Sequence, residues 1–387
     1  MKIKSITQTI IMILIPIIVI EIVLRFTLEK HNHTTRILKK PWNVILPIDT
    51  PDSTAFKTKF TDNSYTTYHP QLGWSLRPNG KNLPKYFSSN QGFRIKKNDY
   101  LKNNIVHNAD IITIGDSFTH GDFVFCEESW PYILGEISSK KVVNLGVGGY
   151  GIDQAILSYM LSEIETEIVI LGLINADLDR ATRIVYRGLY GGGIKSKPMF
   201  KFNLNGSYDI VNQPCAVGIN LYNQFNLREN SPLLKMEKDF DEILFKKDFF
   251  DMFISYRIFK MFSYRYYHPG HSLYLNKQAN DNYHYIMNIF NALYQFSKNK
   301  KDKVIIVLLE SAGSSQDRKK YEINPWVNIE NDLKKIGFDV IQPPDTLISL
   351  LANDKDKIIN KNEGHYTPLA NEIVAKEIYN YMMTNIE

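Results

Sequence analysis

The first pattern along the chain is an apolar run over residues 6–23, "ITQTIIMILIPIIVIEIV", with lysines before it and Arg25 after it. Its length is about what a helix needs to cross a bilayer. Signal peptidase needs small residues at its cleavage site, yet no alanine or glycine precedes Ala55. The pattern therefore predicts an uncleaved N-terminal transmembrane helix over residues 1–28, with the rest of the protein outside the cytoplasmic membrane.

Two features of the run leave another interpretation open. Pro16 and Glu21 interrupt it, so that it could instead form a buried or interfacial helix. Basic residues are also more numerous after the run than before it, the reverse of what the positive-inside rule expects for a translocated body. The anchor and its orientation are therefore separate predictions.

Residues 29–64 are polar and punctuated by prolines, without a helical period, which predicts a linker. Short aromatic segments follow, "YHPQLGWSLRPNG" and "SSNQGFR", bounded by Pro, Asn and Gly. Such segments predict turns and small strands packed against a domain. We therefore expect the main domain to cover residues 65–387.

From Asp110 onward, short apolar runs alternate with segments of helical period. The apolar runs are "IITIG", "KVVNLG", "EIVILGL", "KVIIVLLE" and "FDVIQ", and the helical segments are "EESWPYILGEIS", "DQAILSYMLSEI", residues 326–335 and residues 368–383. This alternation predicts an α/β domain in which helices flank a parallel sheet.

The alternation is interrupted over about residues 181–300. "KPMFKFNLNGSYDIVNQP" alternates apolar and polar residues around Asn205-Gly206, which predicts a β-hairpin. Residues 249–274 are unusually aromatic and basic. We interpret the interruption as an inserted aromatic-rich subdomain; its rings could form a packed core, a platform for sugars or an interfacial patch.

Composition narrows the class of protein. The 387 residues are 44% hydrophobic and 22% charged, which is typical of a globular chain. The net charge of +5 is spread along the sequence, and no nucleic-acid-binding motif accompanies it, so no nucleic-acid partner is expected. Cys126 and Cys215 do not have the spacing of a metal site, and no metal or cofactor is expected. A disulfide between the two cysteines is left as an open alternative.

Candidate chemistry lies where the predicted strands end. Gly115 permits a sharp turn after "IITI", and Ser117 follows two residues later. Asp116 or Ser117 could simply cap the next helix. However, "NLGVGGYG" follows the second strand, "INADLDR" follows the third, and "NEGHYTP" precedes the last helix. In a parallel sheet, the strand-end segments meet at one crevice, where ligands bind.

These four blocks, in this order, resemble the SGNH (GDSL-type) hydrolase family over roughly residues 65–385. The resemblance implies a flavodoxin-like, three-layer α/β/α fold. The segments "LGWSLRPN", "NQGFR" and "KPMF" resemble the membrane-anchored bacterial members of this superfamily.

The resemblance implies roles for particular residues. Ser117 would be the nucleophile and His365 its general base. The oxyanion hole would consist of the backbone N–H groups of Ser117 and Gly149 and the side-chain amide of Asn175.

The sequence departs from the family pattern at two blocks. Asn362 stands where the family has an aspartate, so it could orient the imidazole without stabilising its charge. Glu363, Asp356 or Asp354 could substitute, or a backbone carbonyl could support a Ser-His dyad. In the third block, Ala176 separates Asn175 from Asp177, and an ungapped alignment would put Ala176 at the asparagine position.

His120 is another candidate for the site, because it lies three residues after Ser117 on the same predicted helix. A packing role or a surface position is the favoured interpretation of this histidine. Asp153 and Gln154, after "GGYG", most simply begin a helix.

Together, these observations predict a serine esterase that acts on ester groups, preferably O-acetyl groups, of cell-envelope carbohydrate through an acyl-enzyme. The alternatives are an O-acyltransferase with the same fold and a non-catalytic SGNH-like scaffold. A nucleotide-binding role for "GVGGYG" is disfavoured because a Walker lysine is missing.

Overall fold

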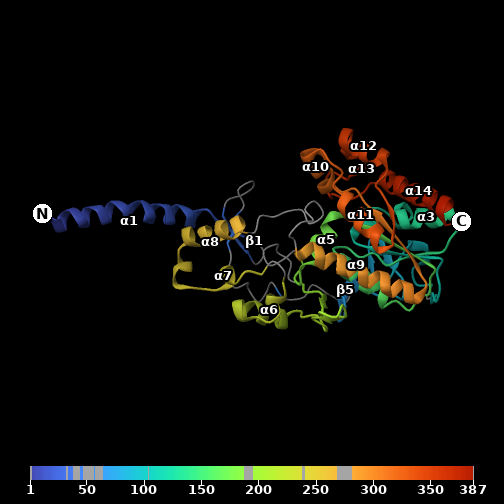
Figure 1. Ribbon diagram of the computed structural model, residues 1–387, viewed down its shortest axis with the longest axis horizontal. Coiled ribbons are helices and arrows are strands. Elements are labelled where there is room, and N and C mark those ends of the chain that lie inside the picture. The colour runs from blue at the N-terminus through green and yellow to red at the C-terminus, as the bar shows by residue number, and fades with distance from the viewer. Residues whose placement is uncertain are drawn as a thin grey trace. The chain divides into compact units, whose positions relative to one another are not determined.

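The computed structural model describes residues 2–31, 34–37, 44–46, 56, 64–102, 104–186, 195–237, 240–267 and 281–386 (Figure 1). The chain divides into two compact units. Unit 1 comprises residues 1–57, 184–195 and 217–270, and unit 2 comprises residues 58–183, 196–216 and 271–387. The predicted insertion, residues 181–300, is thus shared between the two units.

Unit 2 is built on an eight-stranded sheet with the order β15-β14-β11-β9-β10-β8-β7-β6. Five of these strands are mutually parallel: β9 (Ile111–Gly115), β10 (Val142–Asn144), β11 (Ile168–Leu173), β14 (Lys303–Leu308) and β15 (Asp339–Ile341). Numbered along the chain, they have the spatial order 2-1-3-4-5, which is the flavodoxin-like arrangement. The predicted parallel sheet is therefore confirmed.

Three short antiparallel strands extend the sheet beyond β10: β6 (Lys81–Asn82), β7 (Tyr86–Ser88) and β8 (Arg94–Ile95). A separate hairpin joins β4 (Thr66–His69) to β5 (Gly73–Leu76). These strands occupy the aromatic segments from which the sequence predicts small strands. The predicted hairpin around Asn205-Gly206 is also present, as β12 (Met199–Phe202) and β13 (Tyr208–Val211).

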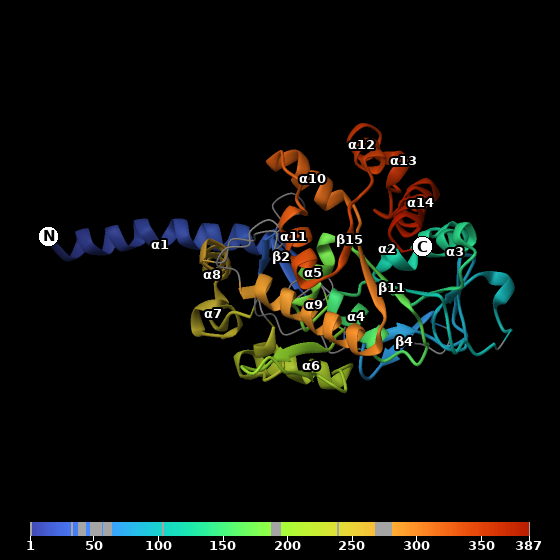
Figure 2. The same cartoon turned by 45° about the vertical axis from the view of Figure 1, so that its right-hand side comes forward.

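Helices cover both faces of the sheet, because its central strands are apolar on both sides. On one face, α3 (Trp130–Ser138) and α14 (Pro368–Asn385) pack together over a core that includes Ile111, Ile170 and Ile305. On the other face, α4 (Ile152–Met160) packs on β9. There α4 contacts α9 (Asp281–Lys300), which in turn contacts α11 (Val327–Ile336) (Figure 2).

The position of α9 corrects the predicted extent of the insertion. Its buried residues, which include Tyr283, Ile286, Phe290 and Leu293, recur with a helical period and face α4, α11 and β14. The helix is therefore the one that leads into β14. The remaining helices of unit 2 are α2 (Ser117–His120), α5 (Asn175–Ala181), α10 (Ala312–Tyr321), α12 (Asp345–Asn353) and α13 (Lys355–Ile358).

Unit 1 contains α1 (Lys2–Phe26), α6 (Ile219–Leu227), α7 (Glu242–Phe245) and α8 (Ile254–Tyr267). It also contains an antiparallel sheet of β1 (Leu28–His31), β2 (Thr34–Ile37) and β3 (Val44–Leu46). These three strands lie in the segment interpreted from its sequence as a linker. That interpretation missed them because the strands are only three or four residues long.

The N-terminal apolar run forms the expected helix, α1. No helix in the described part of the chain combines the length and the apolar character needed to cross a membrane. The predicted transmembrane anchor is therefore not confirmed. Cys126 and Cys215 are both buried free thiols and do not form the disulfide left open above.

Candidate active site

The turn after β9 places Ser117 at the start of α2. Gly115 has φ +151°, and a Cβ atom on it would lie 2.2 Å from Thr119 Oγ1 and 2.6 Å from the Gly172 oxygen. Only glycine therefore fits this close approach. Asp116 caps α2, because its Oδ1 accepts a hydrogen bond of 2.8 Å from the Phe118 amide. The capping role thus belongs to Asp116, which leaves the Ser117 hydroxyl for other contacts.

The place of Ser117 in the sheet is also favourable for binding. β9 lies between β10 and β11, so the strands that follow it along the chain lie on opposite sides of it. In open parallel sheets, ligands bind at the carboxyl ends of the strands where the order reverses in this way.

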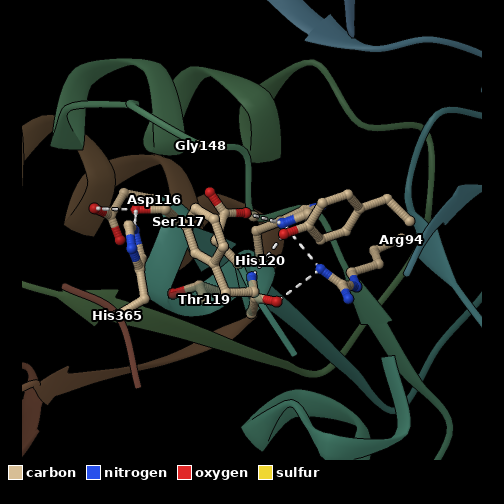
Figure 3. Close-up of polar contacts among 12 residues, drawn as sticks. Arg94, Asp116, Ser117, Thr119, His120, Gly148 and His365 are labelled. Carbon is tan, nitrogen blue, oxygen red and sulfur yellow. Dashed lines mark hydrogen bonds and ion pairs between the residues drawn. The ribbon is translucent and has the colours of Figure 1, made fainter. Parts of the chain in front are cut away.

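Ser117 and His365 are brought together across 248 positions of sequence. The Ser117 Oγ and His365 Nε2 atoms are 2.8 Å apart (Figure 3). His365 Nδ1 lies 2.7 Å from the backbone oxygen of Glu363. A carbonyl oxygen can only accept, so Nδ1 carries the proton and Nε2 is the atom that accepts from the serine hydroxyl. This is the tautomer that a general base requires.

The loop before α14 fixes the imidazole. The Gly364 amide donates to the Asn360 oxygen at 2.8 Å, and Gly364 has φ +72°. The rings of Phe118 and Phe123 pack against the imidazole, with centroid distances of 5.1 and 5.0 Å. The ring is therefore held both by its hydrogen bonds and by aromatic packing.

The role predicted for Asn362 is taken by the main chain. Asn362 is exposed, and its backbone N–H donates to Asn360 Oδ1. Within the described residues, the Asn362 side chain makes no hydrogen bond to His365. Asp354 and Asp356 pair with lysines on the exposed surface. The partner of the imidazole is thus the Glu363 carbonyl, which corresponds to the dyad alternative raised from the sequence.

Two of the predicted oxyanion donors are in suitable surroundings. Over the part of the chain that the structure covers, neither the Ser117 amide nor the Gly149 amide donates a hydrogen bond. A Cβ atom on neighbouring Gly148 would lie 4.0 Å from Ser117 Cβ, so this glycine-rich loop passes beside the serine. Both backbone N–H groups are therefore without an acceptor among the described residues, and their oxyanion role stays a prediction.

Asn175 occupies the start of α5, where its side chain is held by Ser311. The Ser311 hydroxyl donates to Asn175 Oδ1 at 2.7 Å. This contact fixes the position of the side-chain oxygen of Asn175. The NH2 group of the same amide is the donor that could stabilise an oxyanion. The oxyanion role of Asn175 stays a prediction.

Arg180, which was not predicted from the sequence as a site residue, joins three of the four blocks. Its Nη1 donates to Asp116 Oδ2 at 2.8 Å, to Asp177 Oδ1 at 2.8 Å and to the Tyr150 oxygen at 3.0 Å. Burial and the nearby Asp116 charge raise the pKa of Asp177 well above its ordinary value, and Arg180 opposes this rise. The i, i+3 spacing of Asp177 and Arg180 on one helix was the available signal.

His120 is not the partner of Ser117. It is buried, with Nε2 2.9 Å from the Tyr65 hydroxyl and Nδ1 2.5 Å from Asp122 Oδ1 (Figure 3). Burial and the Arg94 guanidinium, 3.0 Å from Nδ1, lower the pKa of His120. Its role is to hold the loop that follows Ser117, since the Asp122 amide in turn donates to the Ser117 oxygen at 2.9 Å.

Asp122 carries a negative charge beside the site. Burial raises the pKa of Asp122, but His120, together with the nearby His365 and Arg94, outweighs burial and lowers this pKa below its ordinary value. Asp122 and Gly148 also line a pocket of about 440 Å³. Ser64, Thr66, Lys81, Asn82 and Tyr86 contribute to its wall. The pocket therefore offers hydroxyl, amide and ammonium groups next to the loops that surround Ser117.

No group of three or more His, Cys, Asp or Glu side chains is placed to hold a metal ion among the residues that the structure describes.

Comparison with known proteins gives little additional information. No family model matches the chain, and no curated protein matches it. Among the solved structures that resemble the chain is a provisionally assigned lipolytic protein of the G-D-S-L family from Desulfitobacterium hafniense, with 13% identity and a TM-score of 0.32. The match covers 71% of this chain and 98% of that one.

Proposed function

We propose that the chain is a serine esterase of the SGNH type, which cleaves ester groups through an acyl-enzyme. The observation that supports this proposal is the 2.8 Å contact between Ser117 Oγ and His365 Nε2, with the imidazole tautomer set by the Glu363 carbonyl. A serine that only capped a helix would not need a histidine from the far end of the chain. It would also not need two nearby backbone N–H groups that make no hydrogen bond of their own.

In the first half of the proposed reaction, Ser117 Oγ attacks the ester carbonyl carbon, and His365 Nε2 accepts the hydroxyl proton. The carbonyl oxygen becomes an oxyanion, to which the Ser117 and Gly149 amides donate, with the Asn175 amide as a third donor. As the intermediate collapses, the C–O bond to the alcohol breaks. His365 returns its proton to that alcohol, which leaves an acyl group on Ser117.

In the second half, water is activated by loss of a proton to His365 Nε2 and attacks the acyl carbon. The Ser117 Oγ–carbon bond breaks, Ser117 regains its proton from His365, and the carboxylic acid is released. His365 thus acts as base and then as acid in each half of the cycle, and no cofactor enters the balance.

We further propose that the substrate is an O-acetylated carbohydrate of the cell envelope. The pocket beside Gly148 supports this choice, because Ser64, Thr66 and Asn82 offer the hydroxyl and amide groups that bind sugar hydroxyls. The same pocket supports the second candidate, an O-acyltransferase, in which a sugar hydroxyl bound there would replace water in the second half of the reaction.

The first experiment is hydrolysis of p-nitrophenyl acetate by the full chain in detergent. Ser117→Ala and His365→Ala are compared with two matched substitutions outside the site, Ser138→Ala and His284→Ala. Loss of activity in the first pair alone supports the esterase. A folded wild type that is no faster than Ser117→Ala and does not react with a fluorophosphonate probe would favour the non-catalytic scaffold.

A transferase is distinguished from a hydrolase by partitioning of the acyl group. With an acetyl donor present, added oligosaccharide would increase the yield of acetylated sugar at the expense of free acetate. If free acetate alone forms at every sugar concentration, the hydrolase is favoured.

A further inference from the structure

Helix α1 of unit 1 exposes apolar side chains on every side. Its apolar residues at positions 12, 14, 15, 17–20, 22 and 23 each keep between 47% and 75% of their surface exposed. Because consecutive residues of a helix point in all directions, this exposure extends round the full circumference. A helix that is apolar on all sides is covered in its working state by protein or by lipid.

Exposed apolar residues also gather at the start of α8, in the same unit. Phe249, Phe250 and Met252 belong to the short 3-10 turn η6 (Phe249–Met252), and Phe259 and Phe262 lie on one face of α8. All five side chains are more than half exposed. Soluble surfaces rarely carry such a cluster, whereas aromatic side chains are enriched at membrane–water interfaces.

Glu21, the residue that interrupts the apolar run, ties these two features together. Its carboxylate accepts hydrogen bonds from the Ile254 amide at 2.7 Å and the Ser255 amide at 3.1 Å, at the N-terminus of α8. Arg25 donates to the Met252 oxygen at 2.9 Å and lies 3.5 Å from Glu21. The end of α1 is therefore fastened to the turn that carries the phenylalanines.

Glu21 and Lys260, two buried charged residues near this junction, have partners within the protein. Lys260 is buried and forms ion pairs of 2.9 Å with Asp251 and 3.0 Å with Asp248. Leu24 and Ile258 pack around buried Ile254 between the two helices. Paired charges and satisfied helix ends are what a hydrocarbon environment demands, since unpaired charges are costly there.

We propose that α1 and the η6–α8 segment form one continuous surface whose partner is a phospholipid bilayer, with the phenylalanines at the interface between hydrocarbon and headgroups. The proposal goes beyond the ester chemistry and does not depend on it. It assigns a role both to the aromatic stretch and to Glu21, whose buried carboxylate holds the two elements together on the lipid side.

Tryptophan scanning with brominated lipids tests the proposal. The full chain is reconstituted in vesicles of phosphatidylethanolamine and phosphatidylglycerol, and Phe250→Trp or Phe259→Trp is compared with wild type to subtract the native tryptophans. Ile219→Trp, an exposed apolar position on α6, is the matched control; α7 and α8 separate it from α1 (Figure 1). Bromolipid should quench the added fluorescence at positions 250 and 259 but not at 219.

The outcomes separate the possible partners of this surface. Quenching at 250 and 259 by aqueous iodide, with none by bromolipid, would overturn the proposal in favour of a solvated surface. Shielding from both quenchers would overturn it in favour of a second copy of the chain. Glu21→Gln should reduce the bromolipid quenching at 250, because it weakens the attachment of η6 to α1. None of these readouts requires the chain to be an esterase.

Discussion

The Nδ1 atom of His365 lies 2.7 Å from the backbone oxygen of Glu363, so the imidazole is oriented by the main chain. A neutral carbonyl fixes the tautomer as well as a carboxylate does, but it contributes no full negative charge when the imidazole becomes protonated. Any negative charge that stabilises the protonated imidazole must then come from another part of the chain. The Asp122 carboxylate, on the loop after α2, is one such group.

Asn362→Ala tests this arrangement. Because the Asn362 side chain is exposed and makes no bond to His365 within the described residues, we expect kcat for p-nitrophenyl acetate to change by no more than about twofold, as is usual at a surface position. Loss of a carboxylate that holds the histidine would instead cost about 10⁴-fold. A large loss in Asn362→Ala, with an unchanged melting temperature, would show that Asn362 orients the base.

The sequence predicted the strands and the Ser117–His365 pair, but of the groups that hold them it suggested only that an unspecified backbone carbonyl could support the histidine. The strands are continuous apolar runs, and their ends must meet in a parallel sheet, so local patterns sufficed. Arg180, by contrast, contacts Asp116 across 64 positions, and no local pattern specifies which carboxylate a guanidinium reaches. The Glu363 carbonyl was equally hidden, since every residue carries one.

Arg180→Gln should lower activity by loosening the serine turn. Arg180 donates to Asp116, which caps α2, and to the Tyr150 carbonyl, which follows the glycine-rich loop. Loss of such charge-assisted bonds costs about 1.5–3 kcal/mol, so we expect kcat to fall about ten- to hundredfold. Steady-state kinetics and the melting temperature, measured together, distinguish a misplaced nucleophile from general unfolding.

The double variant Arg180→Gln/Asp116→Asn provides the check. If both residues act through one contact, the effects of the two single substitutions on kcat should not add. Additive effects would contradict a shared role.

The buried ion pair between Lys197 and Asp153 leads to a stability prediction. Both side chains are almost fully buried, and burial raises the pKa of Asp153 while Lys197 opposes the rise. Lys197→Met should lower the free energy of unfolding by about 3–5 kcal/mol, because it leaves a buried carboxylate unpaired. In Lys197→Met/Asp153→Asn, urea denaturation should show most of that loss recovered. An equal loss in both variants would attribute the effect to packing.

Asp122→Asn should alter how stability depends on pH. The pKa of Asp122 is lowered in the folded protein by His120, His365 and Arg94, which together outweigh burial, so the ionised carboxylate favours folding above its unfolded pKa. That stabilisation is lost as the pH falls through the folded value, which lies below the ordinary aspartate range of about 3.9. At neutral pH, wild type should therefore resist urea better than Asp122→Asn, and the difference between their midpoints should shrink on acidification below that range. A difference that stays constant with pH would mean that the Asp122 charge does not stabilise the fold and that the asparagine acts only by disturbing the loop.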